Sequence, residues 1–163
     1  LPNWLPKTAG NASVLLLATR GTGRLLLQDP APYYIHRALP LLGRTLDTGR
    51  LADILGTAKR WLDSEAGKKN RWKIIGRGEV GVIGAYAAVL DPRIAEVILV
   101  DPPASHRDGP IFLNVLRVLD IPEALGLLAP RPLTIYTTRA SAFERTVSIY
   151  AAAGGPLKLQ ALP

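Results

Sequence analysis

Short apolar runs recur along the chain, and turns that contain glycine, proline or several polar residues separate them. Runs bounded in this way are typical of strands buried in a sheet. Gly76 ends the run at Lys73–Ile75, and Asp101 and Pro102 follow the run at Ala95–Val100. Five segments are predicted as strands on this basis: Ser13–Ala18, Lys73–Ile75, Ala95–Val100, Leu133–Tyr136 and Leu157–Leu162.

Longer segments between these runs have the spacing of helices. Leu46–Ala66 places Leu51, Ile54 and Leu55 near one face, which predicts an amphipathic helix. Val80–Leu90 is rich in alanine, valine and isoleucine, which indicates a helix packed closely on the sheet. Further helical segments are predicted at Ile111–Leu119, Ile121–Leu128 and Ser141–Ala153, the last with a capping box of Ser141 and Glu144.

The alternation of strands with helices predicts the fold class. It favours one α/β domain over residues 1–163, with a parallel, doubly wound sheet and helices on both faces. A chain of 163 residues is long enough to bury a core of its own, and 48% of its residues are hydrophobic. No apolar run is long enough to span a membrane, so no membrane contact is expected.

Composition narrows the chemistry. Cysteine is absent, which excludes disulfides, thiol nucleophiles and thiolate metal sites. With two histidines and no clustered carboxylates, no metal site is expected. The net charge of +7 comes from dispersed basic residues that are not interleaved with aromatic ones, so no nucleic-acid partner is expected. The composition leaves the cellular compartment open.

The most informative stretch is the glycine-rich turn between Lys73–Ile75 and Val80–Leu90. Gly76, Gly78 and Gly81 match the dinucleotide-binding pattern G-x-G-x-x-G. Asp101 lies 20 residues beyond Gly81, at the end of the next predicted strand, where an acidic residue would bind a ribose. One interpretation of this turn is therefore a nucleotide-binding domain.

The same turn also fits the nucleophile elbow, G-x-S-x-G, in which a serine sits between a strand and a helix. In this alignment Gly76 is the first small residue and Gly78 stands at the position of the serine. Val80 or Gly81 takes the last small position. In this interpretation the motif lacks its serine. The neighbouring stretches are therefore needed to choose between a nucleophile elbow and a dinucleotide-binding turn.

Several stretches outside the turn favour the elbow. Thr19–Gly23 (TRGTG) is similar to a D-x-R-G-x-G loop without its acidic residue, and Ala87–Ile94 to an A-A-x-D-x-R-I stretch. Leu128–Leu133 contains the run A-P-R-P, the most specific of these pieces. Together they resemble α/β hydrolases of the dienelactone hydrolase and acetyl xylan esterase type over nearly the whole chain. The resemblance implies an esterase-like fold from about its fourth strand onward, without the first strands.

The resemblance also implies a catalytic triad, and the required residues are missing. Gly78 has no hydroxyl at the nucleophile position, although the backbone N–H of Glu79 would still serve an oxyanion hole. The loop Thr137–Ala142, where the acid would lie, holds no carboxylate, and the histidine would follow Pro163. We therefore expect a domain that is catalytically silent as it stands and needs no cofactor. The alternatives are an active esterase completed by residues outside this chain and the dinucleotide-binding domain.

Other polar residues are candidates for binding. Arg20, Arg77 and Arg139 each follow a predicted strand and could form an anion pocket with the helix start at Glu79. Ser105 and His106 lie in the loop after Ala95–Val100 and are candidate pocket residues. The expected ligand is a small ester or an anion. Because the chain begins at a leucine and ends in a predicted strand, we expect it to belong to a larger protein. Missing first strands would leave an open sheet edge that needs covering or pairing, so a homodimer is a further hypothesis.

Overall fold

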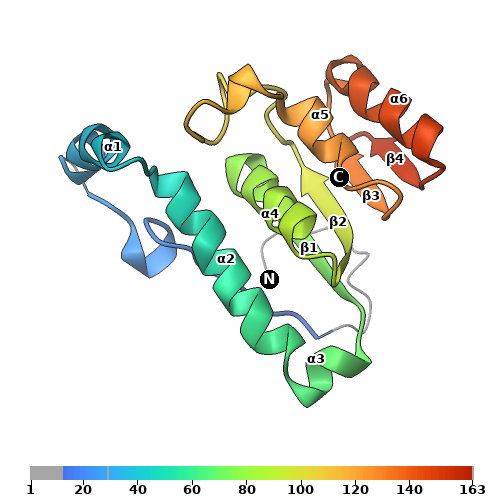
Figure 1. The fold of residues 1–163 in the computed structure, drawn as a ribbon, viewed down its shortest axis with the longest axis horizontal. Coiled ribbons are helices and arrows are strands. Elements are labelled where there is room, and N and C mark those ends of the chain that lie inside the picture. The colour runs from blue at the N-terminus through green and yellow to red at the C-terminus, as the bar shows by residue number, and fades with distance from the viewer. Residues whose placement is uncertain (1–12, 29, 163) are drawn as a thin grey trace.

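The computed structural model describes residues 13–28 and 30–162 (Figure 1). The elements alternate along the chain as the hydrophobic pattern predicts, so the α/β class is confirmed. In chain order they are η2 (Gly23–Leu25), α1 (Ala31–Leu41), α2 (Leu46–Leu62), α3 (Glu65–Lys69), β1 (Trp72–Arg77), α4 (Gly78–Leu90), β2 (Ile94–Val100), η3 (Val115–Arg117), α5 (Ile121–Gly126), β3 (Leu133–Tyr136), η4 (Ala140–Phe143), α6 (Glu144–Ala153) and β4 (Leu157–Gln160).

The four strands form one parallel sheet in the order β1-β2-β3-β4. Their register places Arg77, Val100, Tyr136 and Gln160 in one row at the carboxyl edge. Open parallel sheets place their ligands outside this edge, so the loops that follow Arg77, Val100 and Tyr136 are the first place to look for a site.

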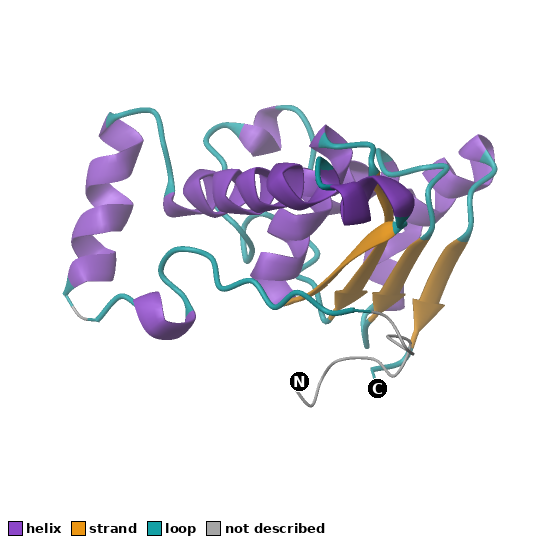
Figure 2. Cartoon of the chain, turned by 90° about the horizontal axis from the view of Figure 1, so that it is seen from below, coloured by secondary structure: helices purple, strands orange, loops and turns teal. Residues whose placement is uncertain are grey.

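The described helices lie on one face of this sheet, as Figure 2 shows. The prediction that helices cover both faces is therefore wrong for the described residues. Each connection moves one strand further in the same direction, and right-handed crossovers in one direction place every helix on the same side. A second helical layer would need the strand order to reverse, which it does not do between β1 and β4.

Alternate strand residues show which side is the core. The row Ile74, Val97, Leu133 and Leu157 faces the helices and packs in the main hydrophobic cluster. The opposite row holds Ile75, Ile98, Thr134 and Lys158, which is more polar. From the helical side, the cluster is completed by Leu62, Val82, Ala85, Ala88, Ile121, Leu125, Leu128, Phe143 and Tyr150.

The predicted strand at Ser13–Ala18 does not form. In the described chain this segment makes no backbone–backbone hydrogen bond, and the side chains of Val14 and Leu16 are 48% and 72% exposed. A strand needs a neighbour to satisfy its backbone groups, and no described strand lies beside this segment. The apolar composition was therefore not sufficient to predict it.

Three predicted helices differ from the observed ones. The helix expected over Leu46–Ala66 ends at Leu62, because the Ser64 side chain accepts from the Gly67 N–H and caps the separate helix α3. Ile111–Leu119 contains only the short helix η3. The capping box expected at Ser141 is absent, since Ser141 belongs to η4 and α6 begins only at Glu144.

Candidate functional site

The turn from β1 to α4 is built by close contact between two glycines. A Cβ atom added to Gly76 would lie 2.5 Å from the Gly81 Cα atom, and one added to Gly81 would lie 2.7 Å from the Gly76 oxygen. No real Cβ atom tolerates such backbone contacts, so both positions require glycine. The first turn of α4 therefore lies directly against the end of β1.

Gly78 differs from these two glycines. Its φ of +58° lies in the left-handed region, yet a Cβ atom added there would meet nothing within 4 Å. A side chain at this position would project into open space at the carboxyl edge, at the start of a helix whose first N–H groups have no intrahelical acceptor. The position has the backbone of a residue presented to a ligand, but it carries no functional group.

The next strand places a carboxylate at the same edge. Asp101 follows Val100, and Val100 pairs with Arg77 in the sheet. Asp101 and Gly78 therefore follow the ends of two neighbouring strands. Its φ of +49° is unusual for a residue other than glycine, and its N–H donates to the Tyr136 oxygen at 2.8 Å. Backbone outliers of this kind cluster at functional sites, which makes Asp101 the strongest polar candidate near the turn.

His106 is held by hydrogen bonds at both ring nitrogens. Nδ1 lies 2.7 Å from the Pro110 carbonyl, which can only accept, so Nδ1 carries the proton. Nε2 then accepts from the Tyr86 hydroxyl at 2.8 Å. The residue is 8% exposed. Its basic lone pair is therefore engaged inside the protein, and it is not presented to Gly78 as a general base would be.

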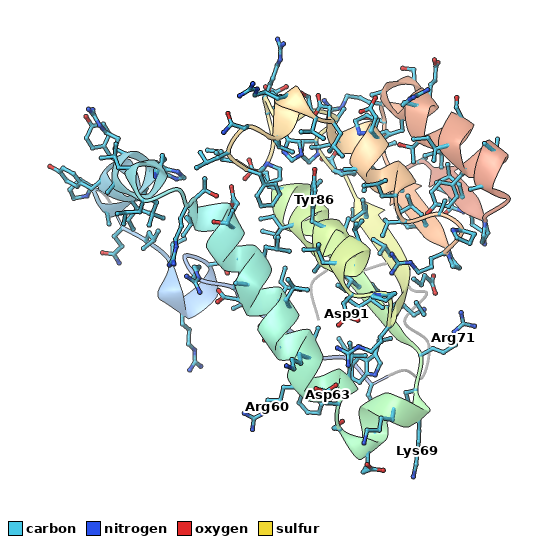
Figure 3. The ribbon with its side chains drawn as sticks, viewed as in Figure 1. Arg60, Asp63, Lys69, Arg71, Tyr86 and Asp91 are labelled. Carbon is cyan, nitrogen blue, oxygen red and sulfur yellow. The ribbon has the colours of Figure 1, made fainter. Side chains whose placement is uncertain are left out.

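The partner of His106 is Tyr86, a partly buried residue of α4 that is labelled in Figure 3. Its ring packs edge-on against Phe112 at 4.9 Å, and His106 contacts the same ring at 5.7 Å. Burial, with a contribution from the charge of Asp120, raises the pKa of Tyr86 to about 12. The hydroxyl therefore stays protonated at neutral pH and remains a donor to His106.

Ser105 and His106 do not form a reactive pair, because their side chains have different hydrogen-bond partners. Its Oγ accepts from the Arg107 N–H at 3.2 Å. The Asp120 carboxylate accepts from the backbone N–H groups of His106 and Ile121 at 2.7 and 2.8 Å. Burial works to raise the pKa of Asp120, but hydrogen bonds from Ser105 and from these two N–H groups outweigh it, so the pKa is lowered. These contacts fix the loop.

The three arginines proposed as an anion pocket lie in different surroundings. Arg20 donates from Nε and Nη2 to both oxygens of Asp53, at 2.9 and 2.6 Å, on the side of α2. Arg139 follows β3 and reaches the Pro102 carbonyl at 3.4 Å. Arg77 is exposed at the end of β1. Arg20 is thus paired with Asp53, and of these three arginines Arg77 and Arg139 remain at the carboxyl edge.

The motifs that carry the resemblance to hydrolases have structural roles in this chain. Arg131 of the A-P-R-P run donates to the carbonyls of Ala88 and Ile94 at 2.7 and 2.8 Å, and so joins the end of α4 to β2. Arg93 binds the Asp91 carboxylate through Nε and Nη2 at 2.9 and 2.7 Å. These residues hold the sheet and helix together at the amino end of the strands, away from Gly78.

Sequence reasoning missed the polar residues that fix the loop after β2. Asp47, in the first turn of α2, accepts from the Ile111 N–H at 2.7 Å, and Thr45 donates to the Ile111 oxygen at 2.6 Å. Tyr86 was also missed, because one tyrosine in an apolar helix gives no signal of its partner. The spacing of Asp120 and Glu123 is a further signal that was missed, because these residues form the capping box at the start of α5.

The described residues limit the chemistry of the site. They contain no group of three or more histidine, cysteine, aspartate or glutamate residues that could hold a metal ion. Among the same residues, no helix combines the length and apolarity needed to cross a membrane. A nucleophile, a free base and a carboxylate oriented toward that base are not brought together around Gly78. Neither the protein-family models nor the curated proteins contain a match to this sequence.

Proposed function

We propose that this chain is an esterase-like domain of α/β-hydrolase ancestry that retains the nucleophile elbow and has lost triad catalysis. The observation that carries the proposal is Gly78, which has the left-handed φ and the open surroundings of an elbow nucleophile but no side chain. A ligand at this position would be a small ester or an anion, with the N–H of Glu79 and the cations Arg77 and Arg139 as polar contacts.

The order of the strands supports this ancestry over a dinucleotide-binding fold. In the dinucleotide-binding order, 3-2-1-4-5-6, the fourth strand lies beside the first. Here β4 lies beside β3, at the far end of the sheet from β1. The sequential order is compatible with the second half of a hydrolase sheet.

Turnover of nitrophenyl acetate by the purified chain tests the loss of catalysis. We expect no turnover above buffer, and none above a His106→Ala variant. Gly78→Ser is the sharper variant, because it returns a hydroxyl to an open position at a cost of about 1–2 kcal/mol for the left-handed backbone. We expect this variant to stay folded by circular dichroism and to remain inactive, since no base is presented to it. Turnover by either the parent or Gly78→Ser would contradict the proposal.

The dinucleotide-binding alternative is kept because of one observation. Asp101 starts one strand away from Gly78, at the edge where a ribose would be bound beside the glycine turn. Titration with NADH, followed by its fluorescence, tests it. Saturable binding that Gly78→Val and Asp101→Ala both abolish would favour this function over the hydrolase ancestry. An active esterase completed by residues outside this chain would instead show turnover only within a longer polypeptide or a complex.

A further inference from the structure

Exposed apolar side chains gather around the start of α2. Leu41, at the end of α1, and Leu42, which follows it, are 87% and 72% exposed. Leu116 and Val118, in the loop after β2, are 48% and 83% exposed. Exposed apolar residues that gather in one place mark contact surfaces for proteins or membranes. These four residues are called the apolar ridge below.

Two hydrogen bonds hold the loop after β2 against the start of α2, close to the end of α1. The Thr45 hydroxyl donates to the Ile111 oxygen at 2.6 Å, and the Asp47 carboxylate accepts from the Ile111 N–H at 2.7 Å. Only two residues separate Leu42 from Thr45. Both halves of the apolar ridge therefore belong to one connected surface, although they are about 75 residues apart in the sequence.

Helix α1 stands out from the rest of the molecule. It has no buried residue over its 11 residues. A helix on the surface of a globular protein usually buries one apolar face against the core. Figure 1 shows α1 at the margin of the molecule, away from the sheet. The end of α1 therefore presents its leucines on a projection.

The charged side chains around the apolar ridge are mainly basic. Arg37 and Arg44 on one side and Arg107 and Arg117 on the other are all exposed. Among the described residues, no carboxylate forms an ion pair with any of these four arginines. Residues 30–46 contain no acidic residue, and residues 105–119 contain only Asp108. This surface therefore attracts anions.

We propose that the apolar ridge and its four arginines bind the surface of an anionic lipid bilayer. The leucine and valine side chains enter the boundary between headgroups and acyl chains, and the arginines contact the lipid phosphates. A contact of this kind lies in the plane of the membrane, so it does not need the long apolar run whose absence led us to expect no membrane contact.

Two observations favour a lipid surface over a protein partner. The apolar ridge lies on a projection, and a fluid surface can receive a projection without a matching hollow. Its apolar side chains are leucine and valine, which are under-represented among the residues that dominate binding between proteins. The proposal uses no residue of the glycine turn and is independent of the function proposed above.

Cosedimentation of the purified chain with lipid vesicles tests the proposal. We expect binding to vesicles of phosphatidylcholine and phosphatidylglycerol in equal amounts, weaker binding as salt is added, and little binding to phosphatidylcholine alone. Leu41→Asp and Val118→Asp, one from each half of the apolar ridge, should each weaken binding at least tenfold. The matched control is Val147→Asp, which changes an exposed valine of α6 and should bind as the parent does.

The arginines are tested with the same vesicles. Arg44→Gln should weaken binding about fivefold, whereas Arg60→Gln, in the last turn of α2, should not. No binding by the parent, or binding to neutral vesicles that is equally strong, would overturn the proposal. Unchanged binding by folded Leu41→Asp and Val118→Asp would also overturn it, because charge alone would then explain the attraction. A parent dimer in sedimentation that Val118→Asp dissociates, without vesicle binding, would overturn it in favour of a second copy.

Discussion

Two apolar segments of this chain have similar composition, but only one of them forms a strand. Residues 94–100 (IAEVILV) form β2, which pairs with β1 on one side and β3 on the other and is buried from Val97 to Val100. Residues 13–17 (SVLLL) form no strand, and their apolar side chains remain exposed. Within the described residues the difference is the presence of strand neighbours, because a strand is stable only where its backbone groups are paired.

The largest expected effect comes from truncating one leucine in each segment. Leu99 is fully buried in the main cluster, so Leu99→Ala should lower the free energy of unfolding by about 2–5 kcal/mol. Leu16 is 72% exposed, and Leu16→Ala should change it by less than about 0.5 kcal/mol. Urea denaturation of both variants measures the contrast. A comparable loss in Leu16→Ala would show that residues 13–17 are buried in solution and would end the comparison.

A second comparison replaces one arginine in the sheet region and one beside residues 13–17. Arg131 joins α4 to β2 through the Ala88 and Ile94 carbonyls, and Arg131→Met should cost about 2 kcal/mol, as expected for hydrogen bonds from a charged group. Arg20 makes bonds of similar length to Asp53 near the N-terminal segment, but its side chain is 52% exposed. Arg20→Met should therefore cost less than about 1 kcal/mol.

Urea denaturation of both variants measures these two losses of stability. Methionine keeps an apolar stem of similar length, so both variants lose mainly the guanidinium contacts. Equal losses would mean that exposure does not weaken the Arg20–Asp53 pair, and that the N-terminal segment is anchored as firmly as the sheet.

These contrasts explain how much of the fold could be predicted. Segments that pair inside the sheet, such as Leu133–Tyr136, were predicted correctly because local apolar pattern and tertiary burial agree there. The strand at Ser13–Ala18 was wrong because the pattern contains no information on whether a neighbour exists. Helices on both faces were wrong for the described residues because the layer arrangement follows from strand order, which the sequence pattern does not reveal.

The candidate site was predictable to a similar degree. The glycine spacing correctly located the strand–turn–helix, since Gly76 and Gly81 are needed where backbone touches backbone. The surroundings of His106 were not predictable, because its partners Tyr86 and Pro110 come from two different segments. Long-range polar contacts of this kind leave no periodic signal in the sequence.

The pH dependence of stability tests the role of Asp91, which lies between α4 and β2. The Arg93 guanidinium, bound to this carboxylate, holds the pKa of Asp91 below its usual range. A lowered pKa stabilises the folded state above the unfolded value of about 4, and this stability is lost as the pH falls through the lower folded value. Asp91→Asn should therefore lower the melting temperature at pH 7 and make its decline below about pH 4 less steep. A parallel decline in both proteins would contradict this role.

The smallest expected effect comes from the substitution Asp53→Asn. Hydrogen bonds from the Arg20 side chain lower the pKa of Asp53, so the sign of the acid dependence is the same as for Asp91. The Arg20–Asp53 pair is exposed, and Asp53→Asn should change stability at pH 7 by less than about 1 kcal/mol, with the difference shrinking as salt is added. Melting curves at low and high salt measure this. If Asp53→Asn flattens the acid profile as much as Asp91→Asn does, residues 13–20 are held as tightly as the sheet. Their exposed leucines would then need a cause other than the lack of a strand neighbour among the described residues.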